Sequence, residues 1–223
     1  MFSPKLDVLS RSQRTLWAEL SSIPKSFVLY GGTALALRLG HRQSIDFDFF
    51  SNKPFQPVSL RDAISFLKHA EMSQFQENTL TAFVDRNGPV KVSFFGDLGM
   101  KRVHAPDVVQ ENGVQIASLV ELAASKLKTI QLRAQAKDYQ DIAAWLDTGL
   151  SLAEALAAAG AIYGKEFNGA LSLKALSYFE DGDLPTLPPE TRKRIMRAAT
   201  SVNLRELPFV AARPGLSPEE DKQ

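Results

Sequence analysis

The 223-residue sequence contains no cysteine, which excludes disulfide bonds, thiolate metal sites and cysteine nucleophiles. No stretch approaches the roughly 18 consecutive apolar residues of a membrane-spanning helix, and the charged N-terminal region has no apolar segment typical of a signal peptide. We therefore expect a cytoplasmic protein with no membrane partner. A strong charge of one sign is also missing, because the formal net charge is only +1. The whole-chain charge thus gives no indication of nucleic-acid binding.

The remaining composition, 44% hydrophobic and 23% charged, is typical of a globular protein, and the length suits one large or two small domains. Up to residue 117, short strand-like runs alternate with helical patterns, and Asp85-Arg86-Asn87-Gly88 is typical of a hairpin turn. From residue 118 the pattern is helical, with capping signatures at Ser118/Glu121 and Ser151/Glu154. The sequence therefore predicts an α/β domain over 1–117 and a helical domain over 118–223.

Several helices and strands are predicted with defined ranges, and three of these helices and two of these strands frame the chain. The helices are expected over 7–22, for about 18 residues after Ser118, and over 189–200, and the strands are expected at 26–30 and 45–50.

The most informative segment is the run from Gly31 to Phe50, which contains two aspartates separated by one phenylalanine. In a strand, alternate side chains share a face, so Asp46 and Asp48 lie on one face about 7 Å apart and Phe47 lies on the other. Two such carboxylates can bind one divalent cation, and magnesium prefers carboxylate, phosphate and water oxygens. The pattern indicates a nucleoside triphosphate–metal site with Asp46 and Asp48 as the metal ligands.

The glycines that precede these aspartates favour phosphate binding. Gly31 and Gly32 allow the backbone to approach a phosphate closely, and the N-terminus of the following helix favours its negative charge. The Thr33 hydroxyl can bond a phosphate or cap the helix. Arg42 and Ser44 could contact a phosphate as well, or be ordinary loop residues.

A second cluster follows Ser118. At about 100° per residue, Lys126, Arg133, Lys137 and Asp141 share one stripe with leucines if a single helix spans them. Such side chains either line a site or are charged groups at the rim of the core whose stems pack against it. The residues alone leave both readings open.

These segments together resemble the AbiEii/AbiGii toxin family of nucleotidyltransferase-like proteins, within the DNA polymerase β-type nucleotidyltransferase superfamily. The resemblance covers roughly residues 25–147. It rests on Gly31-Gly32-Thr33-Ala34-Leu35 followed by Arg42-Gln43-Ser44-Ile45-Asp46-Phe47-Asp48-Phe49, on Lys126-Leu127-Lys128-Thr129-Ile130-Gln131-Leu132-Arg133, and on Lys137-Asp138-Tyr139-Gln140-Asp141-Ile142.

The resemblance implies an α+β fold in which a small mixed β-sheet with flanking helices is followed by a helical C-terminal part. It implies an enzyme that transfers a nucleoside monophosphate from a triphosphate to an acceptor, with magnesium or manganese as cofactor. The acceptor could be transfer RNA, and a cognate antitoxin encoded nearby is an expected partner. The resemblance assigns metal binding to Asp46 and Asp48, the triphosphate to Gly31, Gly32 and Thr33, the nucleotide phosphates to Lys126, and completion of the site to Asp141 or Asp138. The predicted catalytic residues are therefore Asp46, Asp48, Lys126, Asp141 and Asp138, and the predicted nucleotide-binding residues also include Arg42, Ser44 and Arg133.

One position departs from the superfamily pattern. A third carboxylate often lies on a later strand, where it can act as general base, but Ser93 occupies that place in Pro89–Phe95. Asp97 follows the strand and could substitute for it or belong to a loop. Two alternatives therefore stand beside the enzyme: a non-catalytic nucleotide-binding protein of the same fold, and a small-molecule nucleotidyltransferase.

Overall fold

The computed structural model describes residues 2–218, which form two compact units. Of these residues, the first unit contains 2–100, 105–118 and 214–218, and the second contains 101–104 and 119–213.

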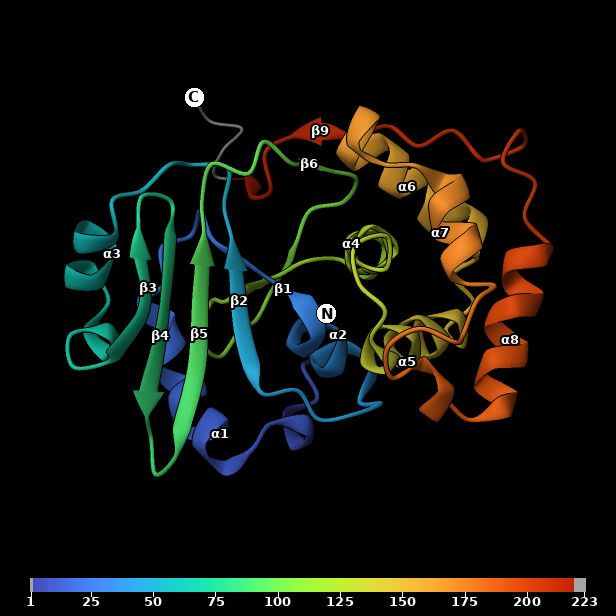
Figure 1. Cartoon of the computed structure of the whole chain (residues 1–223). Helices are drawn as coiled ribbons and strands as arrows, with labels where there is room; N and C mark the ends of the chain where they lie inside the picture. Colours follow the sequence, from blue (N-terminus) through green and yellow to red (C-terminus); the bar gives the residue numbers. More distant parts are fainter. Residues whose placement is uncertain (1, 219–223) are drawn as a thin grey trace. The chain divides into compact units, whose positions relative to one another are not determined.

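A seven-stranded mixed sheet forms the centre of the first unit, in the order β3-β4-β5-β2-β1-β8-β7 (Figure 1). Strand β2 runs parallel to β5 and antiparallel to β1, and β4 and β5 form the hairpin predicted at Asp85–Gly88. The strands are β1 (Val28–Tyr30), β2 (Asp46–Phe50), β3 (Glu71–Gln76), β4 (Thr79–Asp85), β5 (Pro89–Phe95), β7 (Asp107–Val108) and β8 (Gln115–Ile116). The mixed sheet and the α+β class that the resemblance implied are confirmed.

One face of this sheet is packed and the other is polar. Phe47 and Phe49 are fully buried; Phe49 stacks on Phe94 of β5 with ring centroids 5.4 Å apart, and Phe47 lies 6.2 Å from Trp17. Their neighbours in β2 alternate to the opposite face, where Asp46 and Asp48 are partly exposed. The predicted alternation along β2 is therefore confirmed.

The helices of the first unit are short. They are η1 (Leu6–Val8), α1 (Arg11–Trp17), η2 (Ala18–Ser22), α2 (Gly31–Leu39), α3 (Pro57–Ala63) and η3 (Ser65–Leu67). The single helix predicted over 7–22 is wrong, because a capping box starts a new helix inside it. The Ser10 side chain accepts from the Gln13 backbone N–H, and the Gln13 side chain accepts from the Ser10 N–H.

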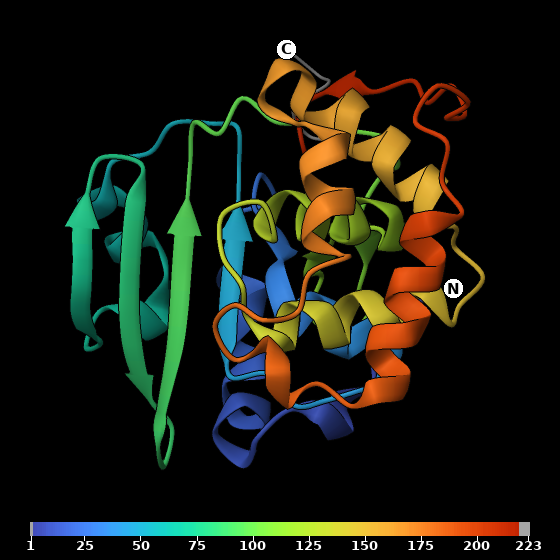
Figure 2. The ribbon, with the colours of Figure 1, turned by 45° about the vertical axis from the view of Figure 1, so that its right-hand side comes forward.

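The second unit is helical. Its elements are β6 (Lys101–Arg102), α4 (Leu119–Thr129), α5 (Ala136–Leu146), α6 (Leu152–Tyr163), η4 (Gly164–Glu166), α7 (Gly169–Ala175), η5 (Leu184–Thr186) and α8 (Pro189–Thr200), and β9 (Arg213–Pro214) lies where the units meet in the sequence. Helix α4 packs against α5 and α6, and α5 packs against α8 (Figure 2). Ser151 and Glu154 form the predicted capping box, and α8 spans the predicted residues. Within residues 2–218, none of the helices is long and apolar enough to span a bilayer.

The helix of about 18 residues predicted after Ser118 is wrong. Helix α4 ends at Thr129, and α5 begins seven residues later at Ala136. The intervening residues contain neither glycine nor proline, so the break has no local signal. A partner distant in the sequence caps the start of α5, because the Asp183 carboxylate accepts a hydrogen bond of 2.6 Å from the Ala136 N–H.

Candidate functional site

Asp46 and Asp48 project from the polar face of β2, in the centre of the sheet. Their register partners on the parallel strand β5 are Lys91 and Ser93, and Tyr30 of β1 lies opposite Asp48. The side chain of Asp46 is 35% exposed, so this carboxylate is accessible to an ion from solvent. The two residues predicted to hold a metal therefore share a face, as their spacing required.

The Asp48 carboxylate lies against the start of α2. Gly31 begins this helix with a φ of +76°, and a Cβ added to it would lie 2.8 Å from Asp48 Oδ2. Only glycine adopts this backbone region without strain and leaves room for the carboxylate. The glycine thus brings the helix N-terminus, with its free N–H groups, next to the acidic pair.

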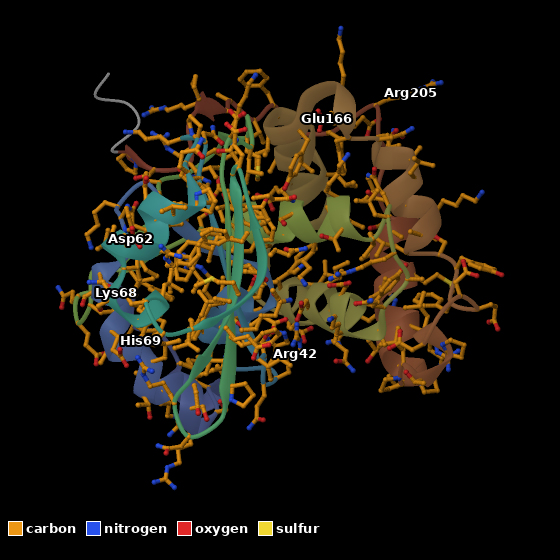
Figure 3. All side chains as sticks on the ribbon, turned by 60° about the vertical axis from the view of Figure 1, so that its left-hand side comes forward. Arg42, Asp62, Lys68, His69, Glu166 and Arg205 are labelled. Atoms are coloured by element: carbon orange, nitrogen blue, oxygen red, sulfur yellow. The ribbon has the colours of Figure 1, made fainter. Side chains whose placement is uncertain are left out.

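The side chains of Arg42 and Ser44 lie at the N-terminus of α2 as well. A Cβ added to Gly32 would lie 2.6 Å from a terminal guanidinium nitrogen of Arg42 and 3.1 Å from Ser44 Oγ. Arg42 lies in the segment between α2 and β2 (Figure 3), and Gln13 of α1 holds this segment through a 2.8 Å hydrogen bond to the Ser44 carbonyl. The structure therefore brings Gly31, Gly32, Arg42, Ser44 and Asp48 together, as expected for an anion site at a helix N-terminus.

Thr33 contributes differently from the prediction. Its side chain is fully buried, and its hydroxyl donates a hydrogen bond to the carbonyl of Asp46. This bond ties the first turn of α2 to the start of β2. The hydroxyl therefore positions the aspartate strand, and the group that remains for a phosphate at this residue is the backbone N–H.

Lys91 was missed in the sequence although it occupies the position beside Asp46. Its ammonium lies 3.8 Å from Asp46 Oδ2, and its side chain is 40% exposed. The signal was available, because alternation in Pro89–Phe95 places Lys91 and Ser93 on one face.

The strand beside the paired aspartates carries no acidic residue over Pro89–Phe95. Ser93 lies next to Asp48 and is 1% exposed. Asp97 lies in the loop after β5, in the left-handed backbone region with a φ of 54°. It follows Ser93 by four residues, or roughly 13 Å along an extended chain, at the end of β5 remote from Asp46. Asp97 therefore does not replace the third carboxylate.

The second predicted cluster is a buried ion-pair group within the helical unit. Lys126 Nζ lies 2.7 Å from Asp138 Oδ1 and 2.6 Å from Asp141 Oδ2. Both carboxylates are completely buried, and the lysine side chain is 8% exposed. The lysine comes from α4 and both aspartates come from α5, so the cluster joins two helices.

Arg133 extends the cluster toward solvent. Its Nε and a terminal nitrogen donate to Asp138 at 2.8 and 3.2 Å, and its side chain is 45% exposed. Burial raises the pKa of Asp138, but the hydrogen bond from Arg133 and the charge of Lys126 outweigh it, so that the pKa lies below the ordinary value of 3.8. Among the described residues, Lys137, which was predicted on the same stripe, forms no ion pair with this group.

No cluster of three or more histidine, cysteine or acidic side chains suited to a metal ion occurs in residues 2–218. An ion at Asp46 and Asp48 would thus have two protein carboxylates and would take its remaining oxygens from substrate and water. This is the donor set by which magnesium is commonly held beside substrate phosphates.

Comparison with known families agrees with this geometry. The family model described as "Nucleotidyl transferase AbiEii toxin, Type IV TA system" matches residues 14–207. The chain belongs to the AbiEii family. It is accordingly a nucleotidyltransferase of a toxin family, and the type IV toxin–antitoxin description implies an antitoxin partner. The family that the sequence motifs resembled is thereby confirmed.

Relatives of this AbiEii-family chain extend over most of its length. The uncharacterized protein aq_aa25 of Aquifex aeolicus (strain VF5) is 32% identical over 180 residues, which cover 78% of this chain and 84% of that protein. A candidate nucleotidyltransferase of H. pylori superposes with a TM-score of 0.56 at 19% identity, covering 89% of this chain and 96% of that one. The nucleotidyltransferase toxin MenT4 of Mycobacterium tuberculosis H37Rv gives 0.55 at 14% identity, covering 86% and 84%. At these identities the two structures support the fold.

Proposed function

We propose that the first unit carries the nucleotidyl-transfer site of this AbiEii-family protein, with Asp46 and Asp48 as ligands of magnesium or manganese. The observation that carries the proposal is the contact between Asp48 and Gly31. It places the acidic pair at the N-terminus of α2, where backbone N–H groups favour a triphosphate. Arg42 and Ser44 reach the same helix end and are suited to hold phosphate oxygens.

The proposed reaction is an in-line displacement at phosphorus. A hydroxyl oxygen of the acceptor attacks the α-phosphorus of the nucleoside triphosphate, the bond to the bridging oxygen of the β-phosphate breaks, and pyrophosphate leaves. The proton of the hydroxyl passes to water, because β5 offers no carboxylate beside Asp48. A bound divalent ion would supply neutralisation of charge on the phosphates. The helix N–H groups and Arg42 would orient the leaving pyrophosphate.

The proposal assigns no tested role to four residues that were predicted to take part in the site: Lys126, Asp138, Asp141 and Arg133. Each of them has a partner within the helical unit, and the role in nucleotide binding and catalysis that the resemblance implied remains a prediction. The division of the chain into domains 1–117 and 118–223 also remains a prediction.

The two alternative functions make different demands on the part of the site that would bind the acceptor. A cationic small-molecule acceptor would need further acidic groups beside the paired aspartates, whereas β5 presents Lys91 next to Asp46, Ser93 next to Asp48, and no acid. This charge favours an anionic acceptor such as transfer RNA. A protein that binds triphosphate and metal but transfers nothing to any acceptor would be the non-catalytic alternative.

The proposal is tested with the full chain, a labelled nucleoside triphosphate, Mg²⁺ or Mn²⁺, and transfer RNA. Asp46→Asn and Asp48→Asn should each lower label transfer by about 10²–10³-fold, the scale for loss of one charge-stabilising group. Asp62→Asn is the matched control, because Asp62 is a 61%-exposed carboxylate on α3. It lies well apart from Arg42 (Figure 3). Transfer that persists in both Asp46→Asn and Asp48→Asn would overturn the assignment.

A further inference from the structure

The polar face of the sheet continues beyond the paired aspartates as a row of side chains. Asp46 is in register with Lys91 of β5, and Lys91 is in register with Phe83 of β4. Neighbouring strands lie about 4.8 Å apart, so Phe83 is roughly 10 Å from Asp46 across the sheet. All three side chains therefore share one face of the first unit, in line across three strands.

Phe83 is a large aromatic side chain exposed on this polar face. It is 37% exposed, whereas its strand neighbours Ala82 and Val84 are buried on the packed face. A large aromatic side chain exposed beside an exposed lysine contributes little to a core. Aromatic rings next to cations are the surfaces on which single-stranded nucleic acids stack their bases.

The in-line geometry of the reaction determines which substrate this row of side chains can contact. The triphosphate is proposed to lie at Gly31 and Gly32, which follow β1, on one side of Asp48. In an in-line displacement, the attacking and leaving oxygens lie on opposite sides of the phosphorus. The acceptor must then approach from the β5 side, where Lys91 and Phe83 lie.

Lys91 is available for a ligand. Its separation from Asp46 is 3.8 Å, and both side chains are more than a third exposed. Exposed pairs of this kind contribute little, so an anion can replace the carboxylate as the partner of the ammonium. The pair also keeps the lysine next to the proposed metal ligands while no acceptor is bound.

We propose that Lys91 and Phe83 form the acceptor subsite, and that it takes the terminal nucleotide of a single-stranded nucleic acid. The base stacks on Phe83, a backbone phosphate binds Lys91, and the terminal hydroxyl points toward Asp46 and Asp48. This inference rests on the proposed function, because it uses the position assigned to the triphosphate. It adds two residues, Lys91 and Phe83, that contact the acceptor and favour a single-stranded end.

Two variants and two matched controls test the subsite, with a fluorescent single-stranded oligoribonucleotide as the probe. Phe75→Ala is the control for Phe83→Ala, because Phe75 is 40% exposed on the adjacent strand but pairs with the buried Leu80 on the other face. Lys68→Ala is the control for Lys91→Ala. Lys68 is an exposed lysine that follows η3, in the region labelled in Figure 3.

The two variants should give different signatures. Phe83→Ala should weaken oligoribonucleotide binding by about 5- to 150-fold, as expected for one lost stacked base, with an unchanged salt dependence. Lys91→Ala should reduce the slope of log K against log salt by about 0.7, as expected for one lost phosphate contact on a single strand. Both should raise the acceptor KM, while the controls keep wild-type values.

Binding of the triphosphate with Mn²⁺, measured by calorimetry, separates this inference from the proposed function. If Phe83→Ala and Lys91→Ala bind triphosphate normally and bind the oligoribonucleotide as the controls do, the subsite is refuted and the transfer site stands. If wild-type protein labels a protein side chain and no nucleic acid, the acceptor class is refuted. Loss of triphosphate binding in Asp46→Asn remains the test of the transfer site itself.

Discussion

The carboxylate of Asp48 lies so close to Gly31 that a single added methyl group would approach Oδ2 to 2.8 Å. This contact joins the two halves of the motif, the glycine turn and the acidic strand, although Gly31 and Asp48 lie 17 positions apart in the sequence. Two independent constraints therefore require glycine at position 31. The backbone is left-handed there, and the carboxylate occupies the space of a side chain.

Gly31→Ala should therefore disturb the site as well as the fold. A residue with a Cβ in the left-handed region costs about 1–2 kcal/mol, and the new methyl group must also displace Asp48. Gly99→Ala is the matched control, because Gly99 has a φ of +61° and nothing within 4 Å of an added Cβ. We expect both variants to melt at lower temperature and only Gly31→Ala to lose Mn²⁺-dependent triphosphate binding. Equal binding by the two variants would contradict the role of this contact.

Ser93→Asp should create the carboxylate that β5 lacks. The new side chain would lie next to Asp48 on the same face, and two like charges in register repel each other. We expect a lower melting temperature without metal and a larger stabilisation by Mn²⁺ than in the wild-type protein, because a divalent ion relieves the repulsion. Thr81→Asp is the control: Thr81 is similarly buried at 3% but is separated from β2 by β5. Its melting temperature should fall whether or not Mn²⁺ is present.

Lys126→Met should destabilise the helical unit strongly. It would leave the carboxylates of Asp138 and Asp141 buried without the ammonium between them, and breaking a buried pair in this way costs about 3–5 kcal/mol. Lys128→Met on the same helix removes a surface ammonium that donates a hydrogen bond to the Glu166 carbonyl, and should change the free energy of unfolding by about 0.5 kcal/mol or less. Denaturant unfolding of both variants measures the difference.

The same experiment separates two roles of Lys126. If the lysine acts only on a nucleotide, Lys126→Met will lose transfer activity and unfold at the wild-type denaturant concentration. If it holds α4 against α5, the variant will unfold earlier with or without triphosphate present.

Acid should destabilise the protein through Asp138. The folded chain holds the pKa of this carboxyl below 3.8, so protons bind preferentially to the unfolded chain as the pH falls through that value. The stabilisation is present above pH 3.8 and is lost progressively below it. Urea midpoints across this range should fall more steeply for the wild-type protein than for Asp138→Asn. Arg133→Ala should lie between them, because it removes the hydrogen bond that lowers the pKa most. Identical slopes in all three proteins would exclude Asp138 as the source.

Local patterns predicted the parts of the site that depend on strand alternation. The spacing of Asp46 and Asp48 placed them on one face, and a glycine pair before a helical stretch placed an N-terminus beside them. Thr33 shows the limit of such reasoning. The residue was placed correctly at the helix start, but its hydroxyl is directed to the Asp46 carbonyl, a partner that only the packing of α2 on β2 supplies.

The sequence by itself determined the family, the fold class and the acidic strand of this protein, because these depend on short-range periodicity and on motifs contiguous in the chain. Only the tertiary structure decided which side chains stand beside that strand. Lys91 lies beside Asp46 because β5 pairs with β2. Asp183 caps the start of α5 at Ala136, although the two residues lie 47 positions apart in the sequence. Such pairings depend on how distant segments pack, and no local pattern of hydrophobic and polar residues encodes them.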